Sequence, residues 1–267
     1  MLILIKILKI WMNGYRIETI ISKRNESEIM EPKVFDPSLM ENRFRHEFKY
    51  ICSYGQLRNL QCRLSGLIPL DPHAGADGIY NIRSLYFDDY YDRCFMENEA
   101  GTDPREKFRI RIYNHSAERI SLELKRKVSG KTQKLSCPLT EEQCRTLMAG
   151  ETPEVTPETP ALLNKLILLM KTSLMRPKVI VEYDRVPYIY PLGNVRITLD
   201  EDIRGSSRVD LFLEDQIPLR LIMPAGQHIL EVKYDEYLPD FIYQTAQLDN
   251  LRTTAFSKYY LCRKYNL

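Results

Sequence analysis

Short segments in which charged and apolar residues alternate are the feature that most constrains this fold. Residues 44 to 50, FRHEFKY, place Arg45, Glu47 and Lys49 at every second position. In an extended strand, alternate side chains point to the same face. The segment therefore predicts a strand whose one face carries arginine, glutamate and lysine together. Such a face is either a solvated outer surface or the wall of a site.

Four more segments repeat this alternation, namely FRIRIY, SLELKRK, NVRITLD and ILEVKY, each with apolar residues on the opposite face. The charged faces are biased toward positive charge, although the whole chain is nearly balanced at 38 Lys and Arg against 36 Asp and Glu. Like charges that stand opposite each other across strands destabilise a sheet, so the clustering indicates a bound polyanion. The basic members are Arg45, Lys49, Arg109, Arg111, Lys125, Lys127, Arg196 and Lys233, and the acidic members are Glu47, Glu123, Asp200 and Glu231.

Two arrangements fit these strands. In one, the apolar faces pack inward and the charged faces meet water. In the other, the sheet closes as a barrel with its charged faces inside, and helices cover its apolar outside. The apolar segment ALLNKLILLMKTS, residues 161 to 173, would suit such an outer helix. Many strands at short intervals with a few helices between them predict an α+β fold, built as an antiparallel barrel or a sandwich.

Few helices are predicted. Leucine spacing indicates one over residues 56 to 64, and the segment SKYYLCRKY near the end indicates another. The expected helix signals are a capping box of Thr140 with Gln143, a start at Thr159-Pro160, a stop at Pro177 and a cap at Ser257.

Composition excludes several classes of protein. A net charge of +2 does not indicate a general nucleic-acid binder. The six cysteines form no C-x-x-C pair and the four histidines lie far apart, so zinc spacing is absent and reduced cytosolic thiols are expected. The stretch SGKT at 129 to 132 lacks the first glycine of a P-loop, since Lys125 stands there, and is read as a hairpin turn.

The first 42 residues are expected to be a poorly ordered or amphipathic lead-in to a domain over residues 43 to 267. The segment MLILIKILKIWM is apolar but short, and Lys6 and Lys9 interrupt it. It falls below the roughly 20 apolar residues of a spanning helix. It is either an interfacial segment or an upstream extension of the true start. The expected location is cytoplasmic, with a peripheral place at the inner face of a membrane as a further option.

The motifs R-x-E-x-K-Y, R-I-R-x-Y, L-E-L-K-R-K, V-R-I-T-L-D, I-L-E-V-K-Y and a final S-K-Y follow one another in this order. Together they resemble the VTC domain, the catalytic domain of polyphosphate polymerases, within the triphosphate tunnel (CYTH-like) superfamily. The resemblance runs from about Arg43 to Lys264. It implies the barrel arrangement, with a basic tunnel and helices packed outside. It also implies synthesis of inorganic polyphosphate from ATP with a divalent metal, Mn²⁺ first and Mg²⁺ second.

The resemblance also assigns roles to residues. Lys49, Arg109, Arg111, Lys125 and Arg196 would hold the triphosphate, and Glu231 would bind the metal, with Glu47 as a secondary metal contact. The expected further substrate contacts are Arg45, Lys127, Lys134, Lys233, Ser257 and Lys258. ATP and polyphosphate are the expected partners, a separate membrane protein is a further option, and the sequence leaves the oligomeric state open.

Arg45 departs from the hydrolytic members of the superfamily, which resemble this chain but open with E-x-E-x-K. Here an arginine replaces the first of two carboxylates that help to bind metal. This favours polymer synthesis over hydrolysis. A tunnel triphosphatase and a non-catalytic polyphosphate sensor remain as alternatives.

Overall fold

The computed structural model describes residues 6–12, 15–21, 44–247 and 250–265. The chain divides into two compact units, Met1–Leu39 and Met40–Leu267. In the first unit, β1 (Lys6–Met12) pairs with β2 (Tyr15–Ile21) as an antiparallel hairpin. The rest of the expected lead-in over residues 1 to 42 lies outside the described residues, and the boundary at residue 43 stays a prediction.

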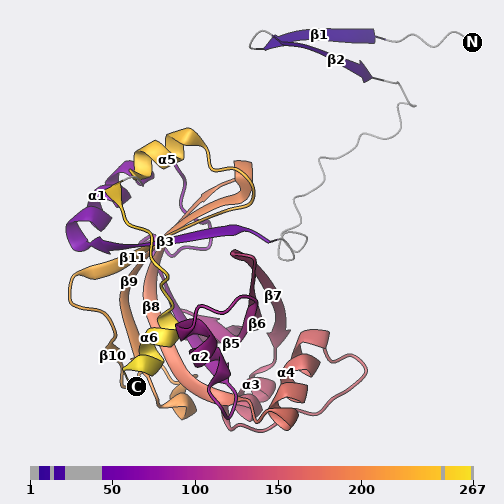
Figure 1. Ribbon diagram of the computed structural model, residues 1–267, viewed down its shortest axis with the longest axis vertical. Helices are drawn as coiled ribbons and strands as arrows, with labels where there is room; N and C mark the ends of the chain where they lie inside the picture. The colour runs from indigo at the N-terminus through magenta and orange to yellow at the C-terminus, as the bar shows by residue number, and fades with distance from the viewer. Residues whose placement is uncertain (1–5, 13–14, 22–43, 248–249, 266–267) are drawn as a thin grey trace, which may run out of the picture. The chain divides into compact units, whose positions relative to one another are not determined.

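The second unit is built on a curled antiparallel sheet that forms a half-barrel (Figure 1). Its strand order is β3-β11-β9-β8-β4-β5-β6-β7, and β10 pairs with β9. The strands are β3 (His46–Ser53), β4 (Tyr80–Asp88), β5 (Arg105–Tyr113), β6 (Ser116–Val128), β7 (Lys131–Leu139), β8 (Arg176–Tyr190), β9 (Val195–Ser206), β10 (Arg220–Leu221) and β11 (Gln227–Tyr234).

The two ends of this sheet meet at one isolated antiparallel bridge between Arg45 and Thr132. The backbone N–H of Arg45 donates to the carbonyl of Thr132 at 2.9 Å, and the N–H of Thr132 donates back at 3.0 Å. The other edge positions of β3 are partly covered as well, since the N–H of Thr254 donates to the carbonyl of Lys49 at 2.8 Å. The predicted α+β fold with an antiparallel barrel is confirmed.

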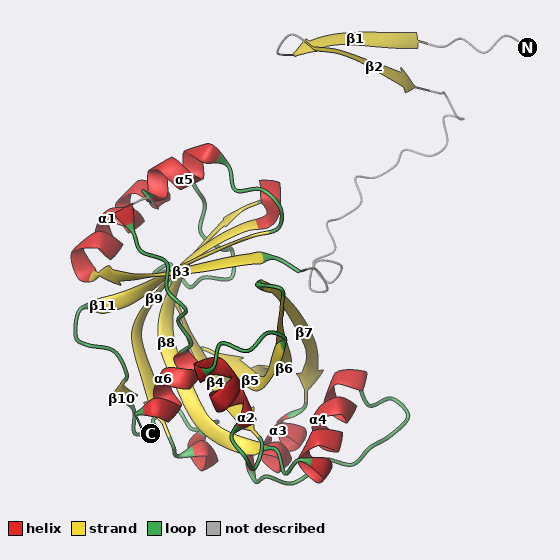
Figure 2. Ribbon diagram, in the orientation of Figure 1, coloured by secondary structure: helices red, strands yellow, loops and turns green. Residues whose placement is uncertain are grey.

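Helices cover the outside of the sheet, as Figure 2 shows. On one side, α1 (Tyr54–Ser65) and α5 (Asp240–Ala246) pack against β3, β11 and β9. On the other side, α3 (Glu141–Met148) and α4 (Ala161–Thr172) pack against β5, β6 and β7.

The apolar faces of the strands are buried under these helices. Phe108 and Leu122, for example, pack in one core with Leu147 of α3 and Leu163 and Leu166 of α4, and all five are at most 1% exposed. Each such burial stabilises the fold by roughly 1.5–3 kcal/mol. Because this energy is gained on the outside of the curl, the charged faces of the same strands are turned inward. The barrel arrangement, and not the sandwich with a solvated charged face, is therefore correct.

Two short helices lie on the inner side of the sheet, a position that the sequence did not indicate. These are α2 (Arg93–Glu99) and α6 (Lys258–Lys264). Tyr259 and Cys262 of α6 pack with Phe256 against inward-facing Val181 and Ile229. Part of the inner face is thus apolar and covered by α6, and the remaining part is charged.

A buried carboxylate, that of Asp88, holds α6 on the inner side of the sheet. Asp88, at the end of β4, accepts a hydrogen bond from the Tyr259 hydroxyl. The same carboxylate accepts the backbone N–H groups of Cys94 at 2.8 Å and Phe95 at 3.1 Å, at the start of α2. Asp88 therefore links β4, α2 and α6 through one fully buried side chain.

Most helix signals are confirmed. The Thr140 hydroxyl accepts the backbone N–H of Gln143 at 3.1 Å, and Oε1 of Gln143 accepts the backbone N–H of Thr140 at 3.0 Å, which is the predicted capping box. Ser257 caps α6 by accepting the N–H of Tyr260 at 3.3 Å. The SGKT stretch is a hairpin turn between β6 and β7, with Ser129 and Gly130 at φ of 50° and 76°.

The predicted start at Thr159-Pro160 is confirmed, since α4 begins at Ala161 with Pro160 at the N-cap position. The Thr159 side chain itself does not cap the helix, because its hydroxyl accepts the N–H of Thr156 at 2.8 Å. The expected stop at Pro177 is wrong. The helix already ends at Thr172 with Ser173 as its C-cap, Leu174 takes a left-handed backbone with φ of 52°, and Pro177 lies inside β8. Within the described residues, no helix is long and apolar enough to cross a membrane.

Candidate functional site

Strand register brings the two predicted metal ligands close together on the inner face. Lys49 of β3 stands opposite Glu231 of β11, and Glu47 stands opposite Lys233. Acid and base therefore alternate along both strands and across them. This pattern places each carboxylate beside more than one ammonium group.

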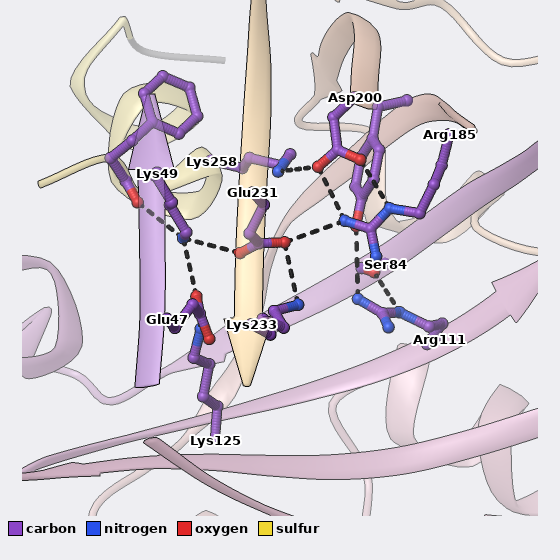
Figure 3. Close-up of polar contacts among 12 residues, drawn as sticks. Glu47, Lys49, Ser84, Arg111, Lys125, Arg185, Asp200, Glu231, Lys233 and Lys258 are labelled. Carbon is purple, nitrogen blue, oxygen red and sulfur yellow. Dashed lines mark hydrogen bonds and ion pairs between the residues drawn. The ribbon is translucent and has the colours of Figure 1, made fainter. Parts of the chain in front are cut away.

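Glu231 lies at the centre of the cluster (Figure 3). Its carboxylate is 3.4 Å from Nζ of Lys49, 3.0 Å from Nζ of Lys233 and 3.2 Å from Nη2 of Arg185. Burial alone raises the pKa of a carboxyl group, but these cations outweigh it and hold the pKa of Glu231 well below its ordinary value. Glu231 is thus a fixed anion at neutral pH.

Glu47 is a second fixed anion, next to Glu231. Its Oε1 is 2.6 Å from Nζ of Lys125 and 3.2 Å from Nζ of Lys49. Burial raises its pKa, but the attraction of Lys125 and Lys49 exceeds the effect of burial, and the pKa of Glu47 falls to about 2. The ammonium group of Lys49 also donates to the carbonyl of Phe256 at 2.9 Å, just before α6.

Asp200 of β9 joins α6 to the same cluster. Arg185 donates to both of its oxygens, at 2.6 and 2.8 Å, and Lys258 donates to Oδ2 at 2.6 Å. Because Arg185 also contacts Glu231, one guanidinium bridges two carboxylates on neighbouring strands. The ammonium of Lys258 also lies 4.5 Å from the ring centroid of Tyr183.

The opposite wall carries the two predicted arginines of β5. Arg109 donates to Glu123 through Nε at 2.7 Å and to the Tyr86 hydroxyl at 3.0 Å. Arg111 lies 3.7 Å from Glu123 and donates to Ser84 at 3.4 Å. Burial raises the pKa of Tyr86, but the two guanidinium groups outweigh burial and lower it. Both arginines are held in place on the inner face by Glu123 and by hydroxyl groups of β4 and β8.

The structure brings most of the predicted residues into this one cluster. Arg196 is the exception among the predicted catalytic residues, because its side chain is exposed. Arg196 stands opposite Lys233 on the neighbouring strand, at the margin of the inner face.

The other predicted substrate contacts lie around the cluster. Arg45 lies where β3 meets β7, and Lys127 is half-buried opposite Arg105. Lys134 is 3.7 Å from Glu123. Ser257 lies beside Lys107, whose Nζ donates to its hydroxyl at 3.3 Å.

Sequence reasoning missed two inner-face cations, Lys107 and Arg185. The signal for Lys107 was present, since REKFRIRIY continues the alternation of Arg109 and Arg111 two residues further back. Arg185 had no comparable signal. It lies in KVIVEYDR, where both faces carry apolar residues, and the pairing of β8 with β9 shifts register between Glu182 and Asp184.

The carboxylates of Glu47 and Glu231 fit a divalent ion in part. An oxygen of each lies within 3.4 Å of Nζ of Lys49, so both reach one small region. No group of three potential protein ligands gathers anywhere in the described part of the chain. Two carboxylates suit Mg²⁺ or Mn²⁺ when substrate phosphates and water complete the coordination.

A comparison with protein families gives the class of this domain. The model of the VTC domain matches residues 44–266, which is most of the chain and all of the described sheet. The chain belongs to the VTC domain family. A search among curated proteins found no match.

Two solved structures show remote likenesses to this chain. The PH1819 protein from Pyrococcus horikoshii is 14% identical over 83% of this chain and 99% of its own, with a TM-score of 0.45. The PH1012 protein of the same organism is 14% identical over 81% of this chain and 98% of its own, with a TM-score of 0.44. These likenesses are too remote to say anything about function.

Proposed function

We propose that this domain makes inorganic polyphosphate, by transferring the γ-phosphoryl group of ATP to the end of a growing chain on the inner face. Membership in the VTC family supports a role in polyphosphate or triphosphate chemistry. The choice of synthesis rests on one observation, the state of the inner-face carboxylates.

All four carboxylates described at the cluster are paired with cations, and each has a lowered pKa. They are Glu47, Glu123, Asp200 and Glu231. A carboxylate with a low pKa is a poor proton acceptor at neutral pH. Attack by water requires a proton to be removed, whereas a terminal phosphate oxygen is already ionised. The cluster therefore suits a phosphate acceptor better than water.

The cations suit the remaining requirement of phosphoryl transfer, which is positioning and neutralisation of charge. Arg109 and Arg111 can each bind two phosphate oxygens, whereas Lys49 and Lys125 act as point charges. Glu123 orients Arg109, and Glu47 orients Lys125. The pairs keep these cations in place before substrate arrives.

A divalent metal, Mn²⁺ in our proposal and Mg²⁺ as the alternative, would be held by Glu231, with Glu47 as a second ligand. When bound, it would neutralise charge on the phosphate oxygens of the donor. Lys49 lies between the two carboxylates, and its ammonium would then turn to phosphate.

The direct test incubates the purified protein with ATP and Mn²⁺, with and without a short polyphosphate primer. Long polyphosphate together with ADP is the expected product. Free phosphate without polymer would favour the triphosphatase. Binding of polyphosphate without any turnover, unchanged in a Glu231→Gln variant, would favour the sensor.

A pair of variants links the activity to the inner face. The double variant Arg109→Ala/Arg111→Ala should lose synthesis by at least a hundredfold, because two charge-assisted phosphate contacts disappear. Arg126→Ala is the matched control, since Arg126 lies on β6 with its side chain 47% exposed beside Glu106. Wild-type turnover in the double variant would contradict the proposal.

A further inference from the structure

Lys107 is an inner-face cation that the mechanism above does not use. Its Nζ is 3.3 Å from the Ser257 hydroxyl, 3.4 Å from Oδ1 of Asn98 and 4.6 Å from the ring centroid of Tyr259. Among the described residues, no carboxylate oxygen lies within 4.0 Å of Nζ of Lys107, so Lys107 forms no ion pair with them. Its nearest hydrogen-bond partners are thus neutral groups of α2 and of the cap of α6.

Strand register places Lys107 in a row of three lysines. Lys107 of β5 stands opposite Lys125 of β6, which stands opposite Lys134 of β7. Lys125 is compensated by Glu47 at 2.6 Å, and Lys134 lies 3.7 Å from Glu123. Like charges directly opposite each other destabilise a sheet. The row is therefore most stable when an anion lies along it. Of the three lysines, Lys107 is the one for which no carboxylate is described within ion-pair distance.

We propose that Lys107 and Ser257 form a phosphate subsite between β5 and α6, which takes one phosphate group of a polyphosphate or nucleoside triphosphate chain. The ammonium supplies the charge and the hydroxyl supplies one hydrogen bond. The inference rests on the proposed function, because it assigns a further contact to the same substrate.

The electrostatics of Lys107 agree with an unfilled subsite. Burial, together with the positive charges of Lys125, Arg105 and Lys49, lowers the pKa of Lys107 to about 7, although the neighbouring Cys94 acts in the opposite direction. A bound phosphate would stabilise the ammonium form and raise this pKa again. Binding at pH 7 to 8 should therefore take up protons, and affinity should fall as pH rises. The other groups that face Lys107 are Asn98, Ser257, Tyr259 and, on its own strand, Arg109.

The test measures calorimetric binding of tripolyphosphate and of ATP, without metal, to wild type, Lys107→Met and Lys107→Arg. Lys107→Met should weaken tripolyphosphate binding at pH 7 by roughly tenfold to a hundredfold, as for one charge-assisted hydrogen bond. Lys165→Met is the control, because Lys165 pairs with Glu106 on the outer surface and is 43% exposed. It should bind as wild type does.

The pH series tests the subsite independently of the methionine variant. Between pH 7 and 8.5, wild type should lose more affinity for tripolyphosphate than Lys107→Arg, which stays charged throughout. A larger effect of Lys107→Met on ATP than on tripolyphosphate would assign the subsite to the nucleotide donor, and the reverse would assign it to the polymer.

Several results would overturn the subsite. Equal affinity of wild type and a folded Lys107→Met protein, or identical pH profiles of wild type and Lys107→Arg, would each do so. A wild type that binds tripolyphosphate but makes no polymer would reject the proposed synthesis and leave the subsite standing. A wild type that binds neither ligand would reject both.

Discussion

Glu123 illustrates how single residues hold the inner face together. Its carboxylate is 3% exposed and binds Arg109 at 2.6 Å, with Arg111 and Lys134 at 3.7 Å. Glu123→Gln leaves Arg109, Arg111 and Lys134 without this anion, and a broken buried ion pair costs about 3 kcal/mol or more. Urea unfolding at pH 7 should show this loss. A change of less than about 0.5 kcal/mol would mean that solvent already compensates the arginines.

The same residue predicts a pH dependence. Burial raises the pKa of Glu123, but Arg109, Arg111 and Lys134 outweigh it and lower the pKa below its ordinary value of 4.5. A carboxyl group with a lowered pKa in the folded state contributes stability that is present above pH 4.5 and is lost as pH falls below it. Wild type should therefore lose stability between pH 5 and 3 more steeply than Glu123→Gln, as measured by urea unfolding across this range.

At the scale of elements, α6 combines a structural and a functional role. Its Tyr259 hydroxyl bonds to buried Asp88, whereas the next residue, Tyr260, bonds to Glu99 at an exposed position. Tyr259→Phe should cost about 1–3 kcal/mol of stability and weaken tripolyphosphate binding, because Ser257 and Lys258 lose their support. Tyr260→Phe is the control and should change little. Thermal unfolding and binding calorimetry measure both effects, and equal behaviour of the two variants would contradict the account.

A second element, α4, tests whether apolar burial on the outside of the sheet stabilises the arrangement in which the charged faces point inward. Leu166 is fully buried in the core under the sheet, whereas Leu168 of the same helix is 59% exposed. Leu166→Ala should cost about 2–5 kcal/mol in urea unfolding, and Leu168→Ala should cost little. Similar costs at the two positions would show that α4 does not hold the sheet in this arrangement.

Elements with a regular pattern could be predicted from the sequence, and irregular ones could not. The strand around Arg109 and the capping box at Thr140 each follow from spacing alone. The inner position of α6 could not be predicted, because its seven residues show no clear apolar side and its place depends on Asp88, far away in the chain. Arg185 could not be predicted for a different reason: apolar residues stand on both faces of β8, so the sequence does not show which face of that strand is the inner one.

At the scale of the whole domain, the arrangement of charge matters more than its sum. The net charge of the whole chain is only +2, yet cations gather on the inner face of the sheet. Barrels of about eight strands have an interior just wide enough for side chains or one small ligand. In our proposal a single polyphosphate chain would reach the inner face, whereas a DNA duplex would be too wide to enter.

This contrast gives a prediction. Tripolyphosphate binding should weaken steeply with added salt, because several ion contacts are replaced by counterions. A DNA duplex should not displace fluorescent polyphosphate at equal phosphate concentration, and unlabelled tripolyphosphate should. Displacement by duplex DNA would mean that the accessible charge lies on the outer surface.

The pairing of β3 with β11 has a consequence for biosynthesis. β3 is the first strand of the sheet to leave the ribosome, but its neighbour β11 is the last. At roughly 5–20 residues per second, β3 waits about ten to forty seconds for its partner. During that time the nascent chain carries an unpaired strand with Phe48 and Tyr50 on it. The alternating charges of Arg45, Glu47 and Lys49 then reduce the risk of aggregation, since charged residues on an unpaired strand disfavour pairing with strands of other chains.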